Sequence, residues 1–406
     1  LGSRGEAHQL AGRLEDAMAD FTAALTIDPD YAWALAQRGE AHRLAGRHED
    51  AVTDLTAALT INPDYAWALG SRGEAHQLAG RLEDAMADFT AALTIDPDYA
   101  WVLERRGQVH GQAGRHEDAV TDFTAALAIN SDNAWALAQR GQAHRLVGRL
   151  ENAIADFTAA LTIDPDYAWA LTLRGQVHGQ AGRLEDAIAD FTAALTIDPD
   201  YAWALAQRGQ AHQLAGRLED AIADFTAALT IDPDYAWALA QRGEAHRLAG
   251  RHEDAVTDFR AAITLEPENV SFRSSLAAAW RSSGQLQTAR TVLTDAARLR
   301  DTDSDLLFEE AMLQLLEVGY AQAIAAWNAF LEAPYDDPDD AVELAARTLF
   351  HGLVVRDTPA DTLINAFLAS SSNLTVLAVV RMYLAELARL ELPVGARAEE
   401  ALRLLA

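Results

Sequence analysis

Residues 32–65 read AWALAQRGEAHRLAGRHEDAVTDLTAALTINPDY. In the first half of this stretch, Leu35, Gly39 and His42 follow one another at steps of four and three, so they share one face of a helix spanning about residues 32–45. Gly39 lacks a side chain where a neighbouring helix must come close. This half therefore predicts an amphipathic helix whose apolar face packs inward.

The second half predicts another helix behind a tight turn. Gly46 is the residue type that commonly ends a helix in the left-handed conformation, and Glu49 and Asp50 then suit the positive end of a helix dipole. The apolar stripe of this helix consists of Val52, Leu55, Ala58 and Leu59. Pro63 ends the unit because proline cannot continue the helical ladder. The stretch is thus one helix–turn–helix unit.

This unit recurs with a period of 34 residues. The proline column consists of Pro29, Pro63, Pro97, Pro165, Pro199, Pro233 and Pro267, with Ser131 in the remaining place. The glycine column consists of Gly39, Gly73, Gly107, Gly141, Gly175, Gly209 and Gly243. Seven full copies begin at residues 32, 66, 100, 134, 168, 202 and 236, behind one partial copy. The sequence therefore predicts a repeat array over residues 1–269.

These columns resemble the tetratricopeptide repeat (TPR) family. The matching positions are Leu35, Gly39, Ala51, Leu55, Ala58 and Pro63, with His42 in place of the usual tyrosine. The resemblance implies an all-α fold: a right-handed superhelical solenoid of antiparallel helix pairs, with a divergent helical C-terminal cap. It also implies a concave groove that is lined by the first helix of each pair and binds proteins or peptides.

The chain is predicted to have three regions. Residues 1–269 form the TPR array, residues 270–337 are degenerate TPR-like repeats, and residues 338–406 are a helical C-terminal capping region. A terminal unit needs a different outer face because no further repeat covers it, which favours a divergent cap. Leu1 corresponds to the fourth residue of a full copy, so we expect the chain to be the C-terminal piece of a larger bacterial protein.

Composition limits the classes of function. The formal net charge is −29, and all 32 basic residues are arginines without a cluster, which argues against a nucleic-acid partner. No apolar run is long enough to span a bilayer, so a soluble, cytoplasmic protein without a membrane partner is expected. The chain has no cysteine and no recognisable catalytic or phosphate-binding motif. We therefore predict no enzymatic activity, no catalytic residue and no cofactor.

Two polar columns are interpreted as structural. Eight histidines from His8 to His246 share one column at a spacing of 34, which does not suit a helical metal site, so no metal is predicted. Each is expected to be a half-buried packing residue with one hydrogen bond. An arginine column and an aspartate column should pair, because a buried guanidinium needs an acceptor. We expect Arg140 and Arg174 to pair with carboxylates such as Asp156 and Asp190.

A tryptophan column gives the candidate binding site. Seven of the nine tryptophans share one register, and glutamine and glutamate columns follow it at helical spacing. The candidate residues are Trp33, Gln37, Glu40, Trp67, Glu74, Trp101, Gln108, Trp135, Gln139, Gln142, Trp169, Gln176, Trp203, Gln207, Gln210, Trp237, Gln241 and Glu244. The resemblance places this stripe in the groove. Two interpretations stay open: the indoles seal adjacent repeats, or they form an aromatic ladder for a peptide.

The function predicted first is a protein- or peptide-binding scaffold, or a sensor region of a larger bacterial protein. The alternative is a substrate-recruiting arm of an upstream enzyme, either a transferase or a protease- or NTPase-linked defence effector. The partner is expected to be basic or apolar-aromatic, because glutamates lie beside the tryptophans in an acidic chain. Self-association or contact with upstream domains is a further expectation. The groove lacks the lysines and asparagines with which chaperone-binding relatives hold a terminal carboxylate.

Overall fold

A computed structural model of the chain describes residues 1–299, 306–307, 309–310, 312–314, 398 and 403. Residues 1–299 contain eighteen α-helices and no β-strand, which confirms the predicted all-α fold. Two compact units, Leu1–Leu173 and Arg174–Ala406, are described separately below. Most of the predicted degenerate and capping regions lies outside the described residues, so the boundaries at 270 and 338 stay predictions.

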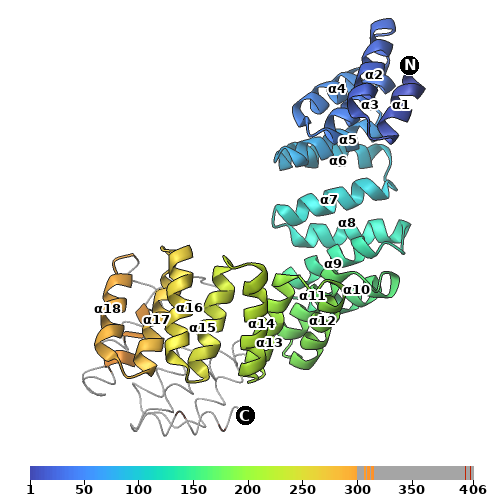
Figure 1. The fold of residues 1–406 in the computed structure, drawn as a ribbon. Helices are drawn as coiled ribbons and strands as arrows, with labels where there is room; N and C mark the ends of the chain where they lie inside the picture. Colours follow the sequence, from blue (N-terminus) through green and yellow to red (C-terminus); the bar gives the residue numbers. More distant parts are fainter. Residues whose placement is uncertain (300–305, 308, 311, 315–397, 399–402, 404–406) are drawn as a thin grey trace. The chain divides into compact units, whose positions relative to one another are not determined.

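The helices alternate between the first and second helix of each repeat (Figure 1). The first helices are α1 (Gly2–Leu10), α3 (Ala32–Leu44), α5 (Ala66–Leu78), α7 (Ala100–Gln112), α9 (Ala134–Leu146), α11 (Ala168–Gln180), α13 (Ala202–Leu214), α15 (Ala236–Leu248) and α17 (Val270–Ser282). The second helices are α2 (Leu14–Ile27), α4 (His48–Ile61), α6 (Leu82–Ile95), α8 (His116–Ile129), α10 (Leu150–Ile163), α12 (Leu184–Ile197), α14 (Leu218–Ile231), α16 (His252–Leu265) and α18 (Leu286–Ala296). The helix bounds agree with the predicted repeat to within about a residue.

Each first helix ends in the same glycine turn. Gly46 has a φ of +75°, its N–H donates to the carbonyl of Arg43 at 3.0 Å, and the N–H of Arg47 donates to the carbonyl of His42 at 2.9 Å. These bonds satisfy carbonyls that the helix end leaves open, and the left-handed conformation favours glycine. The prediction that glycine ends the helix here is confirmed. The turn reverses the chain so that α4 packs antiparallel to α3.

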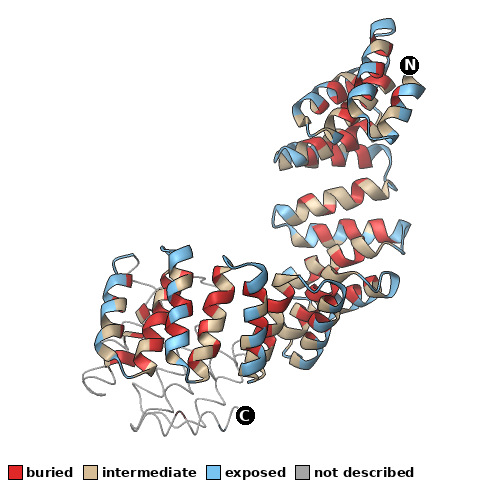
Figure 2. Cartoon of the chain, viewed as in Figure 1, coloured by how far each residue is buried: buried red, intermediate tan, exposed pale blue. Residues whose placement is uncertain are grey.

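The helices pack in consecutive order within each unit. In the first unit α3 contacts α4, α4 contacts α5, and α5 contacts α6; in the second, α13, α14, α15 and α16 follow the same order. Consecutive first helices also contact one another, as α3 and α5 or α13 and α15 do. Buried residues face the neighbouring helices, whereas exposed residues lie in the turns and on the outer side of the helices (Figure 2). We call the surface formed by the first helices the first-helix face.

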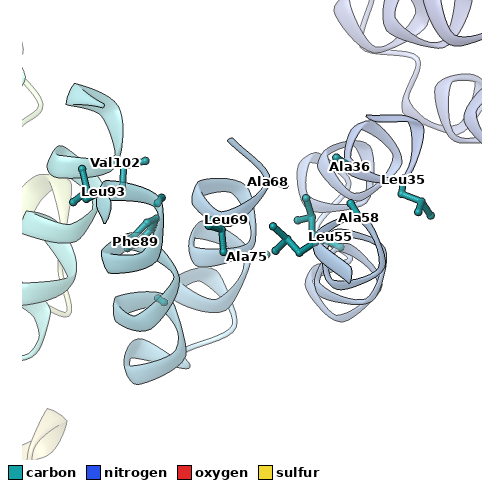
Figure 3. Packing of buried hydrophobic residues seen from close by; sticks show 14 of the residues in the cluster. Leu35, Ala36, Leu55, Ala58, Ala68, Leu69, Ala75, Phe89, Leu93 and Val102 are labelled. Carbon is teal, nitrogen blue, oxygen red and sulfur yellow. The ribbon is translucent and has the colours of Figure 1, made fainter. Parts of the chain in front are cut away.

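The core of each repeat is an aromatic or leucine side chain set against a glycine. Leu55 and Phe89 are completely buried on second helices, and Figure 3 shows them between the helices of the first unit. A Cβ atom added to Gly39 would lie 2.8 Å from Leu55 Cγ, and one added to Gly73 would lie 2.7 Å from Phe89 Cε1. Each buried side chain of this size contributes about 1.5–3 kcal/mol. The close approach therefore depends on the glycine column, as predicted.

An arginine–aspartate pair ties each first helix to its second helix. Arg140 Nε donates to Asp156 Oδ2 at 2.9 Å, and its Nη2 donates to Oδ1 at 2.6 Å. Arg140 Nη1 also donates to Thr124 Oγ1, on the preceding second helix, at 3.3 Å. The same two-pronged bond joins Arg38 to Asp54, Arg72 to Asp88, Arg106 to Asp122, Arg174 to Asp190, Arg208 to Asp224 and Arg242 to Asp258. The predicted pairs of Arg140 and Arg174 are confirmed.

A histidine lies beside each of these aspartates. His144 Nε2 is 3.8 Å from Asp156 Oδ2, and its Nδ1 has no hydrogen-bond partner among the described residues. The predicted hydrogen bond is therefore not made by His144 Nδ1 within the described residues. Burial lowers the pKa of His144, and the charge of Arg140 acts in the same direction while Asp156 opposes it. The pKa is lowered, with burial the largest cause, also at His76, His110, His178, His212 and His246.

Two glycines on first helices should respond to alanine in opposite ways. Gly73→Ala pushes a methyl group into the ring of Phe89 and should lower the free energy of unfolding by about 1–3 kcal/mol. Gly111→Ala is the matched control, because a Cβ there meets no atom within 4 Å, and it should raise stability by up to about 1 kcal/mol. Urea denaturation of both variants measures the difference. Equal effects would contradict the assigned packing.

Stability should fall as the pH falls from about 7.5 to 5.5. Because burial lowers the pKa of six histidines in the folded chain, the unfolded chain binds more protons below its ordinary histidine pKa of about 6.5. The free energy of unfolding is therefore highest above that pH and decreases below it. Urea denaturation at both pH values should show a smaller loss for a His178→Gln/His212→Gln variant. An equal loss in the variant would exclude these histidines as the cause.

Candidate functional site

The predicted binding residues all lie on first helices and are half-buried. Each tryptophan is the second residue of its helix, directly after the N-terminal turn, and the glutamine and glutamate columns follow one and two turns later. Their side chains are partly accessible on the first-helix face. The structure thus places them on one face of the helices, as the spacing predicts, and their role in binding stays a prediction.

Each indole packs against the preceding repeat. A Cβ atom added to Gly70 would lie 2.8 Å from Trp101 Cζ3, and one added to Gly2 would lie 2.9 Å from the same atom of Trp33. The Trp33 ring also meets Phe21 edge to face, with the ring centroids 5.9 Å apart and the planes at 81°. The same arrangement joins Phe123 to Trp135 at 6.0 Å and Phe225 to Trp237 at 6.3 Å. These contacts support the interpretation that the tryptophans pack adjacent repeats together.

A tyrosine covers the other side of most of these indoles. Tyr31 and Trp33 have centroids 5.6 Å apart at 32°, and Tyr201 and Trp203 are 5.8 Å apart at 40°. Burial raises the pKa of Tyr99, which occupies this column in front of Trp101. The two aromatic rings form a tilted pair at the start of the first helix. This contact holds the half-buried indole at the start of its helix.

The glutamates on this face are paired with arginines. Arg43 donates to Glu40 at 2.6 and 2.9 Å and lies 3.2 Å from Glu74 of the next first helix. In the second unit Arg247 donates to Glu244 at 2.7 and 2.8 Å. The carboxylates beside the indoles are therefore locally compensated. Sequence reasoning overlooked Arg43, although it stands one turn after Glu40 on the same helix.

Arg105 is a second residue of the site that the column pattern did not predict. It occupies the column of Gln37, and its guanidinium carbon lies 5.8 Å from the ring centroids of both Trp101 and Trp135. A cation held between two aromatic faces gains a favourable electrostatic interaction with each ring. Arg105 Nη1 also donates to Gln108 Oε1 at 3.2 Å. The signal in the sequence was the break in the glutamine column.

A hollow opens on the first-helix face between α3, α5 and α7. Its volume is about 400 Å³, and Trp67, Trp101, Arg43, Glu74 and Arg105 are among the residues that line it. Aromatic surface and paired charges therefore meet in one accessible recess. Its walls can stack against planar or apolar groups and can form hydrogen bonds or ion pairs with polar ones.

The other site types are not seen in the described parts of the chain. These residues contain no group of three or more histidines, cysteines, aspartates or glutamates that could hold a metal ion. Among the same residues, no helix is both long and apolar enough to cross a membrane.

In the second unit the glutamine columns approach each other, and Gln176 Nε2 donates to Gln207 Oε1 at 3.1 Å.

Family models of the TPR repeat match most of the described array. Models described as a tetratricopeptide repeat match residues 9–72, 68–99, 202–235 and 241–304, and a model described as a TPR repeat matches residues 141–182 and 179–216. Together these ranges cover more than half of the chain. No curated protein sequence matches the chain.

Solved structures of TPR proteins are similar in fold. A tetratricopeptide repeat protein from Parabacteroides merdae is 20% identical, with a TM-score of 0.50 over 61% of this chain and 98% of its own. The C-terminal part of a TPR repeat-containing protein from Cytophaga hutchinsonii is 13% identical, with a TM-score of 0.50 over 59% and 99%. YrrB, described as a TPR protein with an unusual peptide-binding site, is 23% identical, with a TM-score of 0.41 over 46% and 95%. At 20% and 13% identity, the first two likenesses show the fold alone.

Removing one indole should weaken the array. Trp237→Ala deletes the contacts with Phe225 and Tyr235 and should lower the free energy of unfolding by about 2 kcal/mol or more. Chemical denaturation followed by circular dichroism measures the loss. Gln241→Ala, one turn later on the same helix, is the control and should change stability by less than about 0.5 kcal/mol. A stable Trp237→Ala variant would remove packing as the reason for the column.

Proposed function

Because the chain belongs to the tetratricopeptide repeat family, we propose that it is a binding scaffold whose first-helix face holds a peptide or protein segment. Arrays of this family are typical protein-interaction scaffolds. The observation that carries the proposal is that the seven indoles of the column are half-buried and that six of them pack against a neighbouring tyrosine. Function as a sensor region, as a recruiting arm or in self-association remains a prediction, as does a cytoplasmic location.

Preorganisation supports the choice of the indoles as anchors. A side chain that is already held by packing loses little freedom when a ligand contacts it, so more of the contact energy appears as affinity. Trp67 and Trp101 lie beside the recess of about 400 Å³, which is large enough for one or two side chains of a ligand. Each anchor that is fully engaged would contribute about 2 kcal/mol or more. Two anchors would give a useful affinity.

Charge supports a partner that is not acidic. The chain carries a net charge of −29, and the first turn of most second helices presents exposed carboxylates such as Glu49 and Asp50. These charges repel acidic ligands and attract basic ones, an effect that acts mainly on the rate of encounter and weakens with salt. The glutamates on the first-helix face are paired with arginines, so the contact surface itself is less acidic than the molecule. We therefore propose a basic or apolar-aromatic segment.

The proposal predicts which peptides the chain selects. A random dodecapeptide library displayed on phage should be enriched in tryptophan, tyrosine, arginine and lysine after selection on the intact chain, and depleted in aspartate and glutamate. The best selected peptide should bind a Trp135→Ala/Trp169→Ala variant at least about tenfold more weakly, measured by fluorescence anisotropy. Raising the salt concentration should slow association more than it speeds dissociation.

Two controls separate binding from folding in this experiment. Leu161→Ala on α10 loosens packing at a second helix and should leave the affinity unchanged while lowering stability. Circular dichroism confirms that each variant is folded at the temperature of the assay. Selection of acidic peptides, or an equal affinity of the folded double variant, would overturn the proposal and leave the indoles a packing role alone.

A further inference from the structure

Two repeats depart from the others at the end of the first helix. The penultimate residue of this helix is Gln9, Arg43, Gln77, Arg145, Gln213 or Arg247 in six repeats, and it is Gly111 and Gly179 in the other two. The last residue changes with it: the leucine of those six helices is replaced by Gln112 and Gln180, while α17, outside the regular array, ends in Ser282. Both departures therefore occur together, twice, in helices α7 and α11.

Neither the backbone nor the packing requires these glycines. Neither Gly111 nor Gly179 has a left-handed φ. A Cβ atom added to either would meet no atom within 4 Å. The glycine column that includes Gly73 is different, because a Cβ there collides with Phe89. Glycine weakens a helix relative to glutamine or arginine. Because they have no side chain, the two glycines leave space near the end of the first helix.

That space is a hollow reaching the core of the repeat. Beside Gly111 lies a hollow of about 310 Å³ lined by Phe123, and beside Gly179 lies one of about 260 Å³ lined by Phe191. Phe123 and Phe191 are each 2% exposed, so both side chains belong to the buried core next to the hollow. Each hollow therefore borders a buried aromatic ring of the repeat core.

The rim of each hollow is made of amides. Gln108, Gln112, Gln139 and Gln142 line the first, and Gln176, Gln180, Gln207 and Gln210 line the second. The column of Glu40 holds glutamate at Glu6, Glu40, Glu74 and Glu244, and glutamine at each of the four positions that line a hollow. Neither lining contains an aspartate, glutamate or arginine, in a chain with a net charge of −29. The lining of the second hollow thus has no ionisable side chain, and that of the first has His116 alone.

We propose that each hollow is a specificity pocket for one uncharged aromatic side chain, tyrosine or tryptophan, of the segment bound on the first-helix face. This inference rests on the proposed binding function and names the ligand chemistry. The aromatic side chain fills the space beside Phe123 or Phe191, and the rim glutamines bond to its O–H or N–H group, which needs a hydrogen-bond partner when buried. An acidic or basic side chain is rejected because no carboxylate or guanidinium group lines either hollow to offset its desolvation.

The test fills the pockets with the residue that other repeats carry. Gly111→Gln and Gly179→Gln reproduce Gln77 and Gln213, which occupy the same place in helices of the same length, so both variants should fold. Arg145→Gln changes the same column in α9 without lining either hollow and serves as the matched control. The probe is N-acetyl-5-fluorotryptophan amide, observed by fluorine NMR. N-acetylglutamate amide, observed by proton NMR, is the charged comparison.

The intact chain and the Arg145→Gln variant should broaden the fluorine signal, and the Gly111→Gln/Gly179→Gln variant should not. No broadening, broadening that survives in the filled variant, or equal broadening of the glutamate compound would overturn the pocket. Peptides selected on the intact chain should bind the filled variant at least about tenfold more weakly and should keep a fixed tyrosine or tryptophan. If they bind it equally well, the pocket fails and the binding function stands. If the library yields no binder while the probe responds as expected, the binding function fails instead.

Discussion

The structure depends on a contact between a glycine of the first helix and a buried aromatic ring of the second helix. A helix pair of this length closes only where the first helix has no side chain opposite the core residue of the second, as Gly73 does opposite Phe89. That closure brings the Arg72 guanidinium within reach of Asp88, and its remaining nitrogen within reach of Thr56 on the preceding repeat. Packing sets the distance between the helices, and the hydrogen bonds then fix how far one helix slides along the other. The stacking of repeats follows from both.

Much of this arrangement could be predicted from the sequence because each repeat carries the same pattern of residues. The steps from Leu35 to His42 identify the buried face, Gly46 marks the turn, and the columns of Arg140 and Asp156 predict a pair that the structure contains. These features depend on helical spacing and on the burial of one face, which are local properties. Averaging over the copies strengthens such signals.

The features that the sequence did not predict are those in which single copies differ. The bonds from Arg43 to Glu40 and Glu74, and the place of Arg105 between two indoles, depend on which rotamer a long side chain adopts across a repeat boundary. Spacing alone does not determine that. The tryptophan column shows the same limit, since its register predicts the face on which it lies but not the contact with Phe21. The residues proposed for recognition are those at which one copy differs from the others. A search for repeated columns gives such single differences little weight.

The near-identity of the repeat sequences also affects folding. Helices α2 and α6 have identical sequences, as do α12 and α14, and α3 is identical to α15. A first helix therefore meets the same chemical surface on several second helices and cannot distinguish its own neighbour by side-chain complementarity. Only the short turns, which limit how far a helix can travel, select the correct partner. During refolding at high protein concentration, a helix pair of one molecule fits equally well onto another, so exchange of repeats between chains competes with folding.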